Sequence, residues 1–200
     1  KMNRKLISVL SASIVALGAM SVASASILVS DSFPYSDGNL IGNTPAVGGT
    51  WAAHSGAGSV PIQVMGGEIQ LLQGSGSRED GNAPFDGGYT AADGTILEAS
   101  FDLTVDDPGA TIVNTYFAHF LAGTSSFVSR VWITAPVGAT GYRIALINGS
   151  SLTPGTGSAA FSDDLTFGQT YTITTTYDYT NKTGSLWIDT TDVSSGGIAA

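Results

Sequence analysis

The stretch that decides the fold covers residues 115–148 and reads TYFAHFLAGTSSFVSRVWITAPVGATGYRIALIN. It contains three runs rich in β-branched and aromatic residues, which are separated by short breaks of Gly, Ser, Thr and Pro. Runs and breaks of this kind are typical of consecutive antiparallel strands. The stretch therefore predicts a three-stranded meander with an apolar inner face and an outer face that carries a row of polar side chains.

Strands are also expected on both sides of this meander. Residues 95–105 alternate between apolar and polar, and Leu97, Phe101 and Leu103 share one face. That alternation is the pattern of a half-buried antiparallel strand. Shorter runs predict further strands at residues 27–33, 60–65, 68–73, 170–180 and 184–189. Many short strands, with no helical period beyond the N-terminal segment, predict an all-β fold, an antiparallel jelly-roll β-sandwich.

Composition and charge narrow the class of protein. The chain has 200 residues, of which 12% are charged and 26 are Gly, and this suits one β-domain with many tight turns. Beyond residue 25 it carries 16 carboxylates and four basic side chains, which leaves a net charge of −12. Such a surface repels phosphate backbones, which argues against nucleic acid as a partner. The absence of Cys excludes disulfides and thiolate metal sites.

Residues 1–25 are interpreted as a signal peptide, which an N-terminal helix would carry. Arg4 and Lys5 supply a positive start, residues 6–20 an apolar core, and ASA at residues 23–25 a cleavage site. The apolar core is short for a bilayer span, although an uncleaved anchor is the alternative. We therefore expect export through the general secretory route, to the medium or the cell surface. The mature chain, residues 26–200, is expected to be a single β-sandwich domain with no membrane span.

Several short segments carry a resemblance to a known family. In chain order they are WAAHSGAGSVPIQV (residues 51–64), RED (78–80), YFAHF (116–120), FVSRV (127–131) and TGSLW (183–187). They are similar to segments of secreted bacterial proteins of the concanavalin A-like, laminin-G-like jelly-roll class, and the resemblance covers most of residues 28–189. Similar chains usually continue past the last of these strands and often end in a sorting anchor. The resemblance therefore implies that this domain is truncated at its C-terminus.

A row of polar side chains is expected on the outer face of the meander. If the hairpins close symmetrically, Glu98 lies opposite His119, and His119 lies opposite Arg130. The same alternation places Phe117 on the outer face and Tyr116 on the inner face. A guanidinium and an indole on the outer face can hold a carboxylate and stack on a sugar ring. The candidate ligand-binding residues are His119, Arg130, Trp132 and Arg143. An ordinary cross-strand charge ladder is the alternative.

Catalysis is a further alternative, with Glu98, His119 and Arg130 at the centre of a polysaccharide lyase or glycosidase. In a lyase, His119 would act as the base and Arg130 would neutralise the uronate. The YFAHF strand resembles the YFKAG strand of jelly-roll alginate lyases, but the companion strand with Gln-Ile/Val-His is absent, as is the E-x-D-x-x-E run of jelly-roll glycosidases. Glu98 and Asp102 lie roughly 13 Å apart along one strand, too far for a glycosidase pair.

No organic cofactor is implied, and calcium is the metal that the resemblance suggests. The first candidate ligands are the loop carboxylates Asp31, Asp37, Asp106 and Asp107. No D-x-D-x-D-G loop exists, so solvated turn carboxylates are the alternative. His54, in a Gly-rich loop, is expected to hydrogen-bond the loop backbone rather than to bind metal.

Together these observations favour a non-catalytic extracellular module that binds carbohydrate, a polysaccharide or a cell-surface glycan, or that supports surface attachment. The fold analogy contributes to this hypothesis. Two alternatives stay open, a jelly-roll polysaccharide lyase or glycosidase and a structural cell-surface protein.

Overall fold

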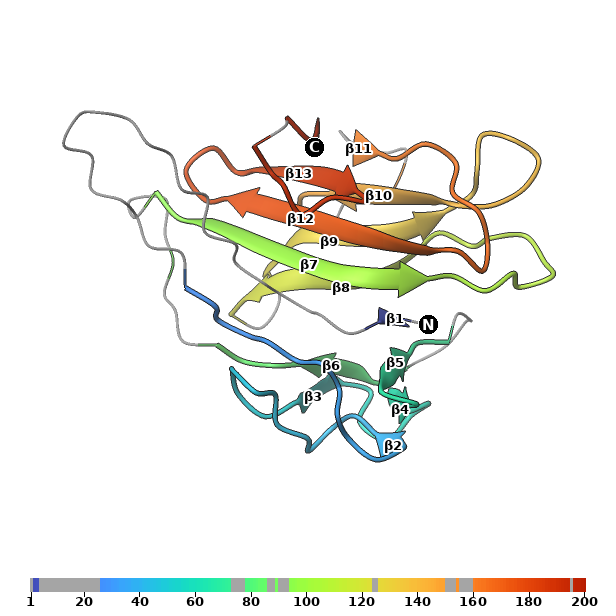
Figure 1. Ribbon diagram of the computed structural model, residues 1–200. Coiled ribbons are helices and arrows are strands. Elements are labelled where there is room, and N and C mark those ends of the chain that lie inside the picture. Colours follow the sequence, from blue (N-terminus) through green and yellow to red (C-terminus); the bar gives the residue numbers. More distant parts are fainter. Residues whose placement is uncertain are drawn as a thin grey trace.

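The computed structural model describes residues 2–3, 26–72, 78–85, 89, 94–123, 126–149, 154, 160–194 and 196–200 (Figure 1). Every regular element in these residues is a β-strand, and the strands pair antiparallel, which confirms the all-β prediction. None of the described residues belongs to a helix long and apolar enough to cross a membrane. Most of the predicted signal peptide, residues 4–25, lies outside the described residues.

The larger sheet contains eight strands. Their spatial order is β14 (Ile198–Ala199), β13 (Thr183–Ile188), β12 (Thr170–Asp178), β7 (Ile96–Thr104), β1 (Met2–Asn3), β5 (Glu68–Gln70), β4 (Gln63–Met65) and β2 (Gly38–Asn39). β7 and β12 form its longest pair, in which Ile96 lies opposite Asp178 and Thr104 opposite Thr170. The predicted apolar face of β7 is confirmed, because Leu97 and Phe101 are buried in the core. The strand is not half-buried as predicted, since Glu98 and Ser100 on its other face are buried too.

The meander forms the main part of a separate four-stranded sheet. The order of its strands is β11 (Ala160–Phe161), β10 (Arg143–Ile147), β9 (Ser126–Thr134) and β8 (Thr115–Ala122). The prediction of three consecutive antiparallel strands is therefore confirmed. A third, two-stranded sheet pairs β3 (Ala52–Ser55) with β6 (Asp80–Asn82).

The main core lies between the two larger sheets, in a sandwich-like arrangement. Figure 1 shows β7, β12 and β13 as one layer in front of β8, β9 and β10. Phe101 and Ile173 from the first layer share a buried cluster with Val131 and Ile144 from the second. Burial of such side chains is the main source of stability of the fold. Ser129 of β9 also donates its Oγ–H to a carbonyl oxygen of β12 (2.9 Å), which links the two sheets directly.

The N-terminal part is organised by one buried carboxylate rather than by a strand. Residues 27–33 were predicted to form a strand, but they form only an isolated bridge, so this prediction was wrong. Asp31 accepts hydrogen bonds from the backbone N–H of Phe33 (2.8 Å), Tyr35 Oη (2.8 Å) and Trp51 Nε1 (2.7 Å). These bonds hold a bend at Phe33, whose φ of 51° lies outside the range of regular strands.

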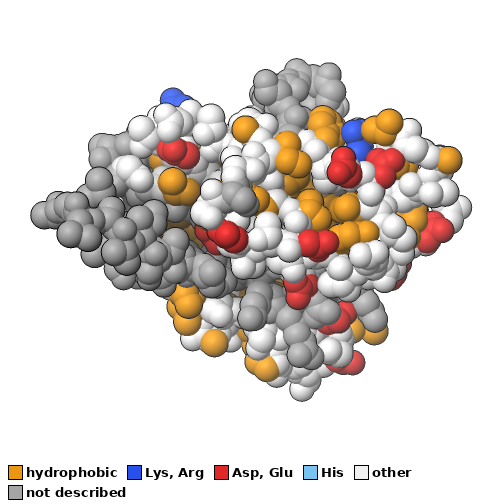
Figure 2. Space-filling view, turned by 45° about the horizontal axis from the view of Figure 1, so that its top comes forward, with side chains coloured by type: hydrophobic (Ala, Val, Ile, Leu, Met, Phe, Trp, Pro, Cys, Tyr) orange, Lys and Arg blue, Asp and Glu red, His pale blue; other side chains and the backbone are white. Residues whose placement is uncertain are grey.

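The described surface is acidic on the side shown in Figure 2. Asp and Glu side chains are spread over this face, and few Lys or Arg side chains accompany them. The picture agrees with the excess of carboxylates in the sequence.

Candidate functional site

Arg130 lies between two aromatic rings on the outer face of the four-stranded sheet. Tyr116 of β8 pairs with Trp132 of β9, and their ring centroids are 5.2 Å apart. The guanidinium carbon of Arg130, two residues before Trp132 and thus on the same face, lies 5.4 Å from the Tyr116 centroid and 5.1 Å from the Trp132 centroid. Both distances are within the range of cation–π attraction. His119 also contacts Tyr116, so His119, Arg130 and Trp132 share the outer face.

This outer face is largely buried, contrary to the expectation of a free surface. Only 4% of Arg130 and 5% of Trp132 is exposed. Arg130 Nη2 donates to the carbonyl oxygen of Gly149 (2.5 Å), and burial lowers the pKa of its guanidinium. Trp132 packs with Ala145 and Ile147 in a small apolar cluster. Stacking of a sugar directly on Trp132 is therefore blocked in this conformation.

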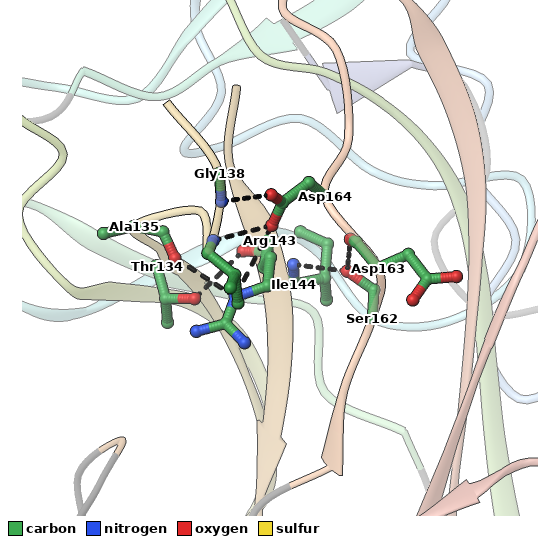
Figure 3. Close-up of polar contacts among 9 residues, drawn as sticks. Thr134, Ala135, Gly138, Arg143, Ile144, Ser162, Asp163 and Asp164 are labelled. Atoms are coloured by element: carbon green, nitrogen blue, oxygen red, sulfur yellow. Dashed lines mark hydrogen bonds and ion pairs between the residues drawn. The ribbon is translucent and has the colours of Figure 1, made fainter. Parts of the chain in front are cut away.

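Arg143 lies at the far end of the same face and stabilises a turn. Its guanidinium carbon is 4.6 Å from the Phe161 centroid, and its Nε donates to the carbonyl oxygen of Ala135 (3.2 Å). Asp164 Oδ1 is 3.9 Å from Arg143 Nε, and Figure 3 shows this carboxylate also accepting the backbone N–H of Gly138 (2.6 Å). It accepts the backbone N–H of Val137 as well (2.8 Å). Those two bonds, more than the arginine, lower the pKa of Asp164. The contacts of Arg143 hold the turn between β9 and β10.

The rings that reach the surface form a group at the other end of the face. We call Tyr116, His119, Phe127 and His54 the ring cluster. The His119 and Phe127 centroids are 4.6 Å apart, and Phe127 is 6.4 Å from Tyr116 and 6.5 Å from His54. Tyr116 is 37% exposed, and His54 of β3 is also exposed. The cluster thus joins the edge strand β8 to the two-stranded sheet.

His119 is a half-buried member of the ring cluster. Its Nδ1–H donates to the carbonyl oxygen of Phe120 (3.3 Å). Burial lowers the pKa of His119, and the nearby charges of His54 and Arg130 act in the same direction, while the Phe120 bond and Asp80 oppose them. A lowered pKa favours the neutral imidazole, which can pack against rings and still hydrogen-bond.

Polar groups from the two-stranded sheet accompany the ring cluster. Ser55 Oγ donates to Asp80 Oδ2 (2.5 Å), and both side chains are exposed. Ser55 directly follows His54 on β3, and Asp80 is the pairing partner of Ser55 on β6. A hydroxyl and a carboxylate next to exposed rings match the two needs of a sugar, hydrogen-bond partners for its hydroxyls and an apolar surface for its ring face.

The predicted row of Glu98, His119 and Arg130 does not form. Glu98 lies on β7 in the other sheet, where it pairs with Thr176 of β12, because β7 pairs with β12 and β1 rather than with β8. The structure therefore brings His119 and Arg130 together and separates Glu98 from them. A catalytic centre built on all three residues is not assembled.

The predicted facing of Tyr116 and Phe117 was also wrong. Phe117 packs inward against Phe101, with centroids 5.9 Å apart, whereas Tyr116 is on the outer face. The pairing of β8 with β9 shifts register between Tyr116 and Ala118 and again between Ala118 and Phe120. Each irregularity adds a residue on one strand and so reverses the simple alternation. The positive φ of Ser129 (51°) in β9 belongs to the same distorted region.

The calcium candidates are spread over separate loops. Asp31 is buried and already accepts its three hydrogen bonds, while Asp37 accepts from Gly66 N–H (2.8 Å) and Asp107 from Gly109 N–H (2.8 Å). Asp106 is exposed. Across the part of the chain that the structure describes, no group of three or more His, Cys, Asp or Glu residues could hold a metal ion.

Sequence reasoning missed that the ring cluster joins strands far apart in the chain. His54 and His119 are separated by 65 positions and meet around Phe127. The only signal was that both fall in segments used for the family resemblance. A comparison of the chain with protein-family models, with curated proteins and with solved structures finds no match.

Proposed function

We propose that this protein is an exported, non-catalytic jelly-roll module that binds carbohydrate through the ring cluster. The observation that carries the proposal is the exposed Tyr116 ring, which Arg130 backs from one side and His119 and Phe127 flank. A ring held by its neighbours loses little conformational entropy when a sugar stacks on it. Ser55, which follows His54 on β3, and its partner Asp80 offer hydrogen-bonding groups for the sugar hydroxyls.

The proposal moves the centre of binding away from the residues predicted first. Of these, His119 is part of the ring cluster, whereas Arg130 supports the cluster from below. Trp132 and Arg143 hold the sheet and the β9–β10 turn. The lyase alternative loses the carboxylate assigned to it, since Glu98 lies on the other sheet.

A glycan array, run with and without calcium, tests the proposal, and affinity electrophoresis in soluble polysaccharides gives the binding strength. We expect Tyr116→Ala to weaken binding at least about tenfold, the equivalent of about 1.4 kcal/mol. Val137→Ala is the matched control, because Val137 is 79% exposed on the β9–β10 turn and lies outside the ring cluster. Absence of any carbohydrate ligand for the unaltered protein, or equal binding by Tyr116→Ala, would contradict the proposal.

A further inference from the structure

A cavity of about 500 Å³ lies between the sandwich and the N-terminal layer. Its walls come from the inner faces of β7, β8, β9 and β12 on one side and from residues 81–85 together with Trp51 on the other. None of the described residues that line it is an Asp, Glu, Lys or Arg. The volume falls in the range of about 300–1,000 Å³ that small-molecule sites occupy.

The sequence produces this space by placing small residues at inward positions. On β7, Ala99 stands between the larger Leu97 and Phe101, and on β8, Ala118 faces the same space. Protein interiors are otherwise close-packed, with few voids larger than a water molecule. A void of this size between large apolar side chains is therefore unusual, and it offers room for a ligand.

A mainly apolar lining favours an apolar occupant over water. Most of the described lining side chains are apolar, and the polar ones are Asn82, Tyr89, His119, Ser129, Thr175 and Tyr179. The Ser129 hydroxyl already donates to the carbonyl oxygen of Thr176 (2.9 Å). Apolar cavities stay dry and take up apolar molecules, because a buried water needs two to four polar partners. His119 is at once a lining residue and a member of the ring cluster, so the cavity adjoins the surface site.

We propose that this cavity binds a small, uncharged, apolar molecule that carries one hydrogen-bonding group, with that group placed at His119. The volume fits a small molecule and not a peptide, and the lack of lining Lys or Arg among the described residues gives an anion no partner. The neutral imidazole of His119, whose Nδ1 is engaged by Phe120, leaves Nε2 to accept a hydroxyl proton. The proposal stands independently of carbohydrate binding.

Calorimetric titration of the full chain with 1-naphthol, an uncharged aromatic alcohol, tests the proposal. We expect saturable binding of one molecule per chain, and we expect Ala99→Leu, which fills the cavity, to weaken binding at least tenfold. Ala52→Leu makes the same change at an exposed position of β3 and should bind like the unaltered protein. His119→Phe should weaken binding of 1-naphthol more than binding of naphthalene, which lacks the hydroxyl.

Two results would overturn the proposal, namely no saturable binding by the unaltered protein or unchanged binding by Ala99→Leu. Circular dichroism establishes that each variant is folded before it is titrated. If Ala99→Leu fails to fold, Ala118→Val is titrated instead, because it adds a smaller side chain to the same cavity. The same loss of 1-naphthol binding is expected.

Discussion

The outer faces of the two larger sheets each bury one charged side chain, and they treat it differently. Arg130, on the four-stranded sheet, lies between the rings of Tyr116 and Trp132 and donates to Gly149. Glu98, on the eight-stranded sheet, is 8% exposed, and its buried Oε1 has no hydrogen-bond partner among the described residues. Ring faces therefore stabilise the buried guanidinium, whereas one oxygen of the buried carboxylate lacks a donor in the described part of the chain.

The largest change in stability is expected for Arg130, the buried charge that ring contacts stabilise. Arg130→Ala should lower the free energy of unfolding by about 2–4 kcal/mol, because it removes the cation–π contacts and the packing of the stem and leaves a carbonyl without its donor. Urea unfolding measures the change. Arg143→Ala is the comparison at a more exposed position, where an ion pair at 3.9 Å, a contact with one ring and a bond to a carbonyl oxygen are lost, and it should cost less. Equal losses in the two variants would show that burial between two rings adds nothing to the contribution of Arg130.

The hydroxyl network on the other outer face should give the next largest effect. Thr174 is fully buried, and its Oγ1 donates to the carbonyl oxygen of Thr190 (2.7 Å) and lies 3.1 Å from Ser100 Oγ. Thr174→Val keeps the shape and should lower the free energy of unfolding by about 1–2 kcal/mol. Thr172→Val, at a partly exposed position bonded to Asp102, should cost less in the same urea experiment. The opposite ranking would contradict this account of the face.

Removing the unsupported charge should stabilise the protein. Burial raises the pKa of Glu98 above its ordinary value of 4.5, so the folded state binds the proton more tightly than the unfolded state. The ionised carboxylate therefore costs stability at neutral pH, and that cost disappears as the pH falls towards 4.5. Glu98→Gln should raise the free energy of unfolding by about 1 kcal/mol at pH 7. The gain should vanish near pH 4, and a loss of stability at pH 7 would count against the comparison.

The smallest effect concerns His119 at the rim of the supported face. Its pKa lies below the ordinary value of 6.5, so the unfolded state takes up the proton first as the pH falls. Stability is then fully present above pH 6.5 and declines below it until the folded-state pKa is reached. His119→Gln should remove this decline in thermal melts recorded from pH 7.5 to 5, and His54→Gln should retain it. A decline that persists in His119→Gln would assign it to another group.

The parts of the fold that were predictable are local. The runs of β8, β9 and β10, and the apolar face of β7, are set by neighbouring residues and turns, and the structure confirms them. Which strand lies beside which is not local, and β7 pairs with β12, more than 60 positions away in sequence, instead of with β8. The register shifts between β8 and β9 could not be predicted from the sequence for the same reason, because a shift is defined only by the pairing of the two strands.

The candidate site was predictable only in part for similar reasons. His119 and Arg130 fell on one face because they lie on strands that were correctly predicted as neighbours. The burial of Arg130 and Trp132 could not be predicted from the alternation of residues. Alternation predicts which face of the sheet a side chain lies on, but not whether other residues cover that face. His54 and Phe127 come together through packing between separate sheets, and the spacing of residues in the sequence does not predict such a contact.

The irregular steps in β8 have a consequence for how this molecule meets its own copies. β8 is the eight-residue outermost strand of its sheet, and a straight strand in that position would offer a continuous ladder on which another chain could add itself. The two register shifts against β9 distort β8 and interrupt its regular run. A distorted border of this kind is a poorer template for a further strand than a straight one.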